Sequence, residues 1–280
     1  MKYQEILNKG SKILELKDIK SFDLDSQILL SSILKLDRAQ LLLNLDKKIE
    51  VNERKNYFKF IERRSRNEPI AYITGYKEFW KSSFKVDNNV LIPRPDTETI
   101  IEQALKELDI YSSKKILDIG TGSGCIIISI LSERKKCFGV GIDVSKNAVK
   151  LAKYNAKIQH IDNRIKFFNS DIDNFYSGKY DIIISNPPYI EHHKINGLEK
   201  DIRYHEPKVA IDGGIDGYDK IRLIIKKSST LIKKKGKLFL ELGINQTKET
   251  LKILNLNGFY KTKVIKDLAS KNRCIVSTKI

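Results

Sequence analysis

An apolar segment that ends in a glycine-rich turn constrains the fold of this chain most strongly. Residues 115–119 (Lys-Ile-Leu-Asp-Ile) predict a buried strand, and Cys125–Leu131 form an apolar helical run. The turn between them consists of Gly120, Thr121, Gly122, Ser123 and Gly124. Glycines at the first turn of a strand–helix unit let a ligand approach the backbone closely. The dinucleotide fingerprint Gly-x-Gly-x-x-Gly is not matched, because Cys125 occupies its last position.

Two further strands end in carboxylates. The run Cys137–Ile142 ends at Asp143, about 20 residues after the glycine turn, where a carboxylate can bind two ribose hydroxyls. A shorter run, Ile165–Phe168, leads to Asp171 and Ile172, which would then border an adenine ring. Taken alone, each aspartate is more simply explained as a turn residue at the end of a strand. Their order along the chain is what favours a nucleoside-binding site.

A fourth apolar run, Tyr180–Ser185, leads into Asn186, Pro187, Pro188 and Tyr189. The Asn186 side-chain carbonyl and the Pro187 backbone carbonyl can accept the two hydrogens of a planar NH2 group. The prolines stiffen the loop, and Tyr189 can lie against the flat face of the bound group. Such acceptors would stabilise the positive charge that develops as the nitrogen attacks. A proline-rich turn without function is the alternative.

The ordered set resembles the class I S-adenosylmethionine-dependent methyltransferases. Among them, the Asn-Pro-Pro-Tyr motif is shared by adenine-N6 methyltransferases and protein glutamine methyltransferases. Adenine N6 and the glutamine amide nitrogen are both NH2 groups on an sp2 carbon, so the motif alone does not choose between them.

The flanking segments resemble the release factor glutamine methyltransferase family, in the same order, over roughly residues 20 to 280. These segments are 68–75, 78–80, 90–98, 203–207, 212–217 and 267–273. Two residues depart from the family pattern. His205 is inserted before Glu206-Pro207, and Ile172 replaces the aromatic ring that some relatives place against the adenine.

The resemblance implies transfer of a methyl group from S-adenosyl-L-methionine to the N5 amide nitrogen of a glutamine. That glutamine would lie in the Gly-Gly-Gln tripeptide of peptide chain release factors. Gly120–Gly124 would cradle the methionine part of the cofactor, and Asp143 would bind the ribose. Asp171 and Ile172 would border the adenine, and Asn186 would also face the cofactor. Asn186, Pro187 and Tyr189 would be catalytic, and Pro188 would complete the substrate site.

No general base is expected, because the sulfonium already activates the methyl group. His192 and His193 are predicted to lie in a solvated loop. The cysteines Cys125, Cys137 and Cys274 are far apart and form no Cys-x-x-Cys pair, so no metal site is predicted. Their use favours a reducing cytoplasm. No apolar stretch approaches the ~18 residues of a membrane span, so no membrane partner is expected.

Three other functions remain open. The target could be a glutamine of a ribosomal protein. The chain could instead methylate adenine N6 in DNA or RNA, which its net charge of +17 would favour. However, no basic arm stands out, so direct nucleic-acid binding is not required. A nicotinamide-dependent oxidoreductase or a non-catalytic nucleotide-binding module is the third class, and the glycine spacing and the intact Asn-Pro-Pro-Tyr argue against these.

The predicted fold is α/β, a doubly wound Rossmann-like sheet with an antiparallel C-terminal strand pair and a small N-terminal helical domain. Residues 1–74 would form the helical substrate-recognition domain, 75–95 a hairpin linker and 96–280 the methyltransferase domain. The strand pair would be Thr262–Ile265 and Cys274–Thr278, beside a strand at Gly236–Leu242.

Local signals predict helix caps and one loop. Asp23 or Asp25, Asn52, and Asp96 are the expected N-caps of three helices. Gly213, Gly214 and Gly217 favour either a mobile lid beside the site or a tight turn.

Overall fold

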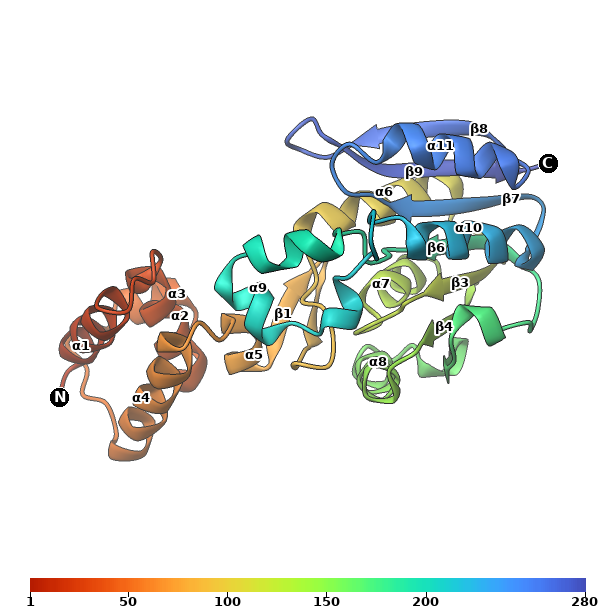
Figure 1. The fold of residues 1–280 in the computed structure, drawn as a ribbon. Helices are drawn as coiled ribbons and strands as arrows, with labels where there is room; N and C mark the ends of the chain where they lie inside the picture. Colours follow the sequence, from red (N-terminus) through yellow and green to blue (C-terminus); the bar gives the residue numbers. More distant parts are fainter. The chain divides into compact units, whose positions relative to one another are not determined.

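The computed structural model describes residues 1–280, which form two compact units (Figure 1). The helical unit comprises residues 1–76 and 199–205. The sheet unit comprises residues 77–198 and 206–280. The short segment 199–205 therefore leaves the sheet unit, joins the helical unit and returns. None of the helices is long and apolar enough to cross a membrane.

The helical unit is built around amphipathic helices. Its elements are α1 (Tyr3–Glu15), α2 (Phe22–Leu34), α3 (Arg38–Leu42), α4 (Val51–Ser65), α5 (Ile70–Thr74) and α9 (Lys200–His205). Apolar residues at helical spacing, among them Ile6, Leu14 and Leu29, are fully buried in one core. α9 is tied to the rest of the unit through His205, whose Nε2 lies 3.1 Å from the Arg66 carbonyl oxygen.

The predicted caps of α2 and α4 are wrong. The N-cap of α2 is Ser21, and Asp23 and Asp25 lie inside its first turn. The Asp25 carboxylate instead accepts from Arg64 Nε at 2.7 Å, in a largely buried ion pair between α2 and α4. A buried guanidinium needs a carboxylate partner, and this need outweighs capping. The N-cap of α4 is Glu50, two residues before Asn52.

Close packing of α1 on α4 gives a stability prediction. A Cβ added at Gly10 would lie 1.9 Å from the Tyr57 hydroxyl oxygen, and Tyr57 is fully buried. We expect Gly10→Ala to destabilise the helical unit by about 1–3 kcal/mol through overpacking. Urea unfolding followed by circular dichroism measures this change. The exposed neighbour Lys9→Ala is the matched control and should be within about 0.5 kcal/mol of the native chain. Equal stability of the two variants would contradict the packing argument.

The sheet unit contains a seven-stranded sheet in the order β5-β4-β3-β6-β7-β9-β8. Its strands are β3 (Lys115–Ile119), β4 (Phe138–Asp143), β5 (Ile165–Asn169), β6 (Tyr180–Ser185), β7 (Ile232–Glu241), β8 (Phe259–Lys266) and β9 (Asn272–Lys279). β5, β4, β3, β6 and β7 pair in parallel, and β9 is antiparallel to both β7 and β8. The predicted sheet and its antiparallel pair are confirmed. Figure 1 shows β8 and β9 at the edge beyond β7.

Helices cover both faces of this sheet. They are α6 (Glu98–Glu107), α7 (Cys125–Glu133), α8 (Lys146–Ile158), α10 (Asp219–Leu231) and α11 (Thr247–Leu256). Short 3-10 turns are η1 (Pro95–Thr97), η2 (Asp162–Arg164), η3 (Ile172–Asn174), η4 (His192–Gly197) and η5 (Lys208–Ala210). Alternate strand residues serve two cores: Ile116 packs with α6, α7 and α8, whereas Leu117 packs with α10 and α11. The buried thiols Cys125 and Cys137 belong to the first core, as expected.

The entry into α6 differs from the prediction. The N-cap of α6 is Thr97, and Asp96 lies within η1. The Asp96 carboxylate pairs with Arg273 on β9 at 3.0 Å, so it does not cap the helix.

A hairpin of β1 (Tyr76–Phe79) and β2 (Ser82–Lys85) is fastened to the sheet unit by hydrogen bonds. The Trp80 backbone N–H donates to Glu98 Oε1 (2.7 Å) at the start of α6. Asn155 on α8 accepts from the Lys85 N–H (2.9 Å) and donates to the carbonyls of Lys85 (3.0 Å) and Ser123 (2.8 Å). Asn155 thus joins the hairpin to the glycine turn, which fixes the segment that leads into the cavity described next.

Candidate active site

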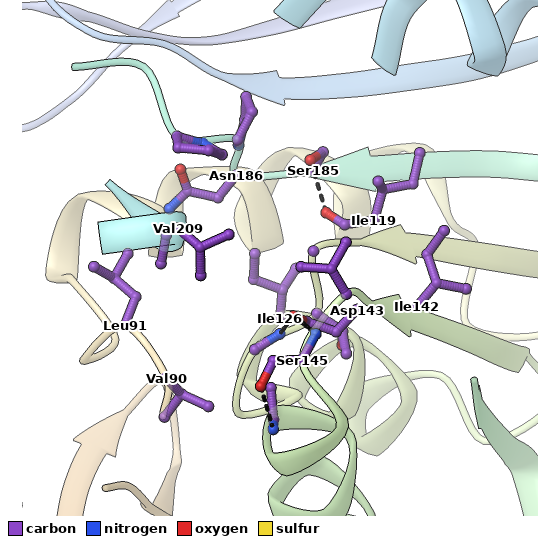
Figure 2. Close-up of a pocket in the computed structure, with 18 of the residues that line it drawn as sticks. Val90, Leu91, Ile119, Ile126, Ile142, Asp143, Ser145, Ser185, Asn186 and Val209 are labelled. Carbon is purple, nitrogen blue, oxygen red and sulfur yellow. Dashed lines mark hydrogen bonds between the residues drawn. The ribbon is translucent and has the colours of Figure 1, made fainter. Parts of the chain in front are cut away.

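A cavity of about 390 Å³ lies at the carboxyl ends of β3, β4, β5 and β6 (Figure 2). The strand order reverses between β3 and β6, and open parallel sheets bind ligands at such a switch point. A short hydrogen bond from Ser185 Oγ to the Ile119 carbonyl (2.7 Å) joins the two strands there. Every residue predicted for the site lines the cavity except Gly124 and Tyr189.

The glycines of the turn serve two different purposes, space for a ligand and packing of a helix. Gly120, Gly122 and Gly124 all have positive φ angles, of 72°, 54° and 80°. A Cβ at Gly120 or Gly122 would meet no atom within 4 Å, so these glycines leave open space for a ligand. A Cβ at Gly124 would instead lie 2.8 Å from Ile128 Cδ1, so Gly124 serves the packing at the start of α7.

Asp143 is held in place before any ligand binds. Its carboxylate accepts from the backbone N–H groups of Gly122 and Ser145, each at 2.9 Å. Burial raises the pKa of Asp143, and these two hydrogen bonds oppose that rise. The carboxylate is therefore oriented from both the glycine turn and the α8 entry.

Asp171 caps η3, because its side chain accepts from the Asp173 N–H at 3.1 Å. The structure thus places this residue both at a turn, as the simpler interpretation expected, and on the cavity wall. Ile172 is buried beside it. Val90 and Leu91, of the segment after the hairpin, also line the cavity.

The Asn186 side chain is oriented by a hydrogen bond to Thr97, a residue for which no role was predicted from the sequence. Its Nδ2 donates to Thr97 Oγ1 at 3.2 Å. Because this contact holds the NH2 end of the amide, the Asn186 carbonyl oxygen is left as the acceptor for a ligand. Pro187 and Pro188 line the cavity beside it. Thr97 lies in the 90–98 segment that carried the family resemblance, but nothing in its residue type signals this contact.

Tyr189 does not line the cavity. Its ring is half-buried against the core of α10 and α11, and a Cβ at Gly243 would lie 2.9 Å from Tyr189 Cδ2. Its backbone carbonyl accepts from Gln246 Nε2 at 3.2 Å. The ring thus packs partly against the core, and its stacking on a bound planar group stays a prediction.

The glycine-rich segment 212–217 is a hydrogen-bonded turn. The Gly213 N–H donates to the Ile190 carbonyl (2.8 Å), and the His192 N–H donates to the Gly214 carbonyl (2.9 Å). A Cβ at Gly213 would lie 2.8 Å from the Tyr189 backbone, so glycine is required for this approach. Of the two interpretations offered above, the tight turn is favoured. His192 and His193 are exposed, as expected for a solvated loop, and His192 Nδ1 lies 2.7 Å from Asp212 Oδ2.

Three charged side chains near the cavity were not assigned a role from the sequence. Arg94 lines the cavity and pairs with Glu206 at 2.6 Å. Glu206 directly follows the segment that joins the helical unit. Asp118 on β3 is fully buried and accepts from Thr121 Oγ1 at 2.7 Å, and burial raises its pKa to about 7.

Comparison with known proteins defines the class. Residues 97–202 match the family model described as "Methyltransferase small domain", and residues 5–75 match the one described as "PrmC N-terminal domain". A methyltransferase from Pyrococcus furiosus has a similar fold, with a TM-score of 0.52 at 16% identity, covering 70% of this chain and 88% of that one. At this identity the likeness concerns the fold alone. Fold and site together define a Rossmann-like methyltransferase.

Full-length relatives define the family. The release factor glutamine methyltransferase of Clostridium acetobutylicum is 36% identical over 282 residues, which cover 100% of this chain and 99% of the relative. The protein of the same name from Clostridium botulinum is 35% identical and covers 99% of both chains. The chain belongs to the release factor glutamine methyltransferase family.

Proposed function

We propose that this enzyme transfers a methyl group from S-adenosyl-L-methionine to the N5 amide nitrogen of the glutamine in the Gly-Gly-Gln motif of peptide chain release factors. The observation that carries the proposal is the orientation of Asn186. Its NH2 end is held by Thr97, so its carbonyl oxygen is available to accept a substrate N–H. The names of the full-length relatives supply the substrate class.

The residues present fit S-adenosyl-L-methionine. Gly120 and Gly122 leave a space that a Cβ would fill, and this space suits the methionine part. The Asp143 carboxylate is oriented by two backbone N–H groups and would accept hydrogen bonds from the two ribose hydroxyls. Asp171 and the buried Ile172 would border the adenine. A volume of about 390 Å³ is in the range of small-molecule sites.

The protein's part in the reaction is to hold and polarise the amide. When bound, the cofactor supplies an activated methyl group. The Asn186 side-chain carbonyl and the Pro187 backbone carbonyl would accept the two N–H bonds of the glutamine amide, with Pro188 and Tyr189 fixing the loop. These acceptors orient the nitrogen and stabilise the positive charge that develops on it. No side chain needs to take the proton before transfer, because the methylated amide is strongly acidic and releases it to water.

We further propose that the helical region, residues 1–74, recognises the release factor, while 75–95 links it to the methyltransferase domain at 96–280. The match of residues 5–75 to a separate family model supports a distinct role for this part. The absence of a basic arm agrees with a protein partner, so direct nucleic-acid binding is not required. The cytoplasmic location expected from cysteine usage stays a prediction.

Mass spectrometry distinguishes this function from the alternatives. The enzyme is incubated with S-adenosyl-L-methionine and, separately, with a purified release factor, purified ribosomal proteins, and a pool of DNA and RNA. We expect a gain of one methyl group on the Gly-Gly-Gln glutamine and none on a release factor in which that glutamine is alanine. Methyl-adenine in the nucleic-acid pool, without release factor methylation, would overturn the proposal.

The glycine turn gives a matched pair of variants. In Gly120→Ala the new methyl group would enter the cavity, so we expect a cofactor Kd raised about 10-fold and a stability loss of only about 1 kcal/mol from the positive φ. In Gly124→Ala the methyl group would collide with Ile128, so the stability loss should be larger, about 2–4 kcal/mol. Calorimetric titration and thermal unfolding measure the two effects. A larger stability loss in Gly120→Ala than in Gly124→Ala would contradict the separate roles given to these two glycines.

A further inference from the structure

The ion pair between Arg94 and Glu206 is a charged contact at the cavity that the mechanism above does not use. Arg94 Nη2 lies 2.6 Å from Glu206 Oε1, and the Glu206 side chain is only 1% exposed. Arg94 lines the cavity, and its side chain is 34% exposed. A guanidinium presents more N–H donors than one carboxylate can engage. The buried carboxylate therefore fixes a charged donor group at the cavity wall, with donor capacity to spare.

The backbone of Arg94 belongs to the turn that orients Asn186. Arg94 stands between Pro93 and Pro95, and a residue that precedes proline favours extended backbone, as its φ of −102° and ψ of 141° show. The Arg94 carbonyl accepts from the Thr97 N–H at 3.0 Å. Thr97 Oγ1 in turn accepts from Asn186 Nδ2 at 3.2 Å. One short turn therefore links Arg94 to the side chain proposed to hold the substrate amide.

The chain beyond Glu206 lines the cavity on the side of Asn186. Val209 of η5 is a lining residue, and Figure 2 shows it on the same side of the pocket as Asn186. The Ile190 N–H donates to the Ile211 carbonyl at 3.2 Å, so this segment also pairs with the chain that leaves the Asn186 loop. The Arg94–Glu206 pair therefore joins two segments of the cavity wall near Asn186, at the end proposed to bind the substrate.

The proposed substrate offers chiefly backbone groups for recognition beside its glutamine. The glycines of Gly-Gly-Gln have no side chains, so a site can recognise only their carbonyl oxygens and N–H groups. Asn186 and Pro187 would supply acceptors for the amide hydrogens, and the glycine carbonyls need donors. The cationic side chains that line the cavity are Arg94 and Lys220, and Lys220 is exposed on α10. Arg94 is thus the cationic donor that a buried partner holds in place.

We propose that Arg94 is a specificity-determining residue that donates to a backbone carbonyl oxygen of the glycines preceding the target glutamine. Glu206 is the positioning residue that holds its guanidinium. This inference rests on the function proposed above. A charged donor strengthens such a hydrogen bond, and the planar guanidinium can engage Glu206 and the substrate together. The Glu206 carboxylate also offsets the charge of Arg94, which would otherwise repel the sulfonium of a cofactor bound in the same cavity.

Methylation kinetics of Arg94→Gln test the proposal. The new amide can still donate to Glu206, so the fold should be kept, and thermal unfolding checks this. We expect the KM for release factor to rise about 10–100-fold through loss of one hydrogen bond from a charged donor. The kcat should stay within about threefold of the native value, because this contact would be equally strong in the ground state and the transition state.

Three companion variants separate the roles of the pair. Glu206→Gln should raise the KM less, about 3–10-fold, because its carbonyl can still accept from Arg94. The double variant should have a KM no higher than that of Arg94→Gln, since Glu206 acts through Arg94. Lys233→Gln, at an ion pair with Asp181 on the amino end of β7, is the control and should leave KM and kcat within about twofold. Calorimetric titration should give a Kd for S-adenosyl-L-methionine within about twofold of native in all four variants.

The other outcomes overturn the inference in distinguishable ways. A raised cofactor Kd with a native KM for release factor would mean that the guanidinium binds the carboxylate of S-adenosyl-L-methionine. A loss confined to kcat would mean that Arg94 only supports Asn186. If the native chain methylates release factor and Arg94→Gln matches it, this inference fails alone. If the native chain methylates no release factor, the proposed function fails and the inference fails with it.

Discussion

Replacing Asn186 by alanine is expected to lower the rate of glutamine methylation by about 10²–10³. The amide of glutamine is a weak nucleophile, since its nitrogen lone pair is delocalised. Of the two carbonyl acceptors proposed to hold it, the Asn186 side chain is the one that a substitution can remove. Thr97 holds the NH2 end of Asn186, so the acceptor is in place before the substrate arrives and its loss is not offset by reorganisation.

Single-turnover assays with purified release factor measure this loss, and calorimetric titration provides the control. The Kd for S-adenosyl-L-methionine should change little in Asn186→Ala, because the ribose and glycine-turn contacts remain. Asn186→Asp is a second test. Its carboxylate can still accept a hydrogen bond from the substrate N–H, but it has no NH2 group to donate to Thr97. Near-native turnover of Asn186→Ala with intact cofactor binding would contradict the role given to this side chain.

Replacing Asp143 by alanine is expected to raise the Kd for S-adenosyl-L-methionine about 10²–10⁴-fold. Two charge-assisted hydrogen bonds to ribose hydroxyls would be lost, each of about 1.5–3 kcal/mol. The backbone N–H groups of Gly122 and Ser145 would also lose their acceptor, which loosens the turn around the cofactor.

Calorimetry with S-adenosyl-L-methionine checks this value, and kcat at saturating cofactor should fall far less than the affinity does. Asp173→Ala, at an exposed carboxylate of η3, is the matched control and should leave the Kd within about twofold. An unchanged Kd in Asp143→Ala would show that the cofactor does not use this carboxylate.

The positions of the glycine turn, Asp143, Asp171 and Asn186 could be predicted because each follows an apolar strand. Carboxyl ends of parallel strands meet at one edge of a sheet, so residues far apart in the chain converge there without any further signal. The cavity gathers these loops as expected. The alternation of strands and helices likewise sufficed for the doubly wound sheet.

The residues that orient the site could not be predicted, because their partners lie far away in the sequence. Thr97 and Asn186 are joined across 89 positions, and Arg94 and Glu206 across 112. Asp25 and Asp96 fit the residue preference for helix caps, yet each binds an arginine from another element. No signal in the sequence indicated that Tyr189 packs partly against the core that contains β7 and α10, and its role as a stacking ring stays a prediction.

A crystal structure with S-adenosyl-L-homocysteine and a release factor tests the central claim most directly. The account predicts that the Gly-Gly-Gln amide nitrogen lies about 2.9 Å from both Asn186 Oδ1 and the Pro187 carbonyl oxygen. The flat face of that amide should be directed toward the cofactor sulfur. A glutamine bound elsewhere, or an Asn186 amide with its NH2 group toward the substrate, would contradict it.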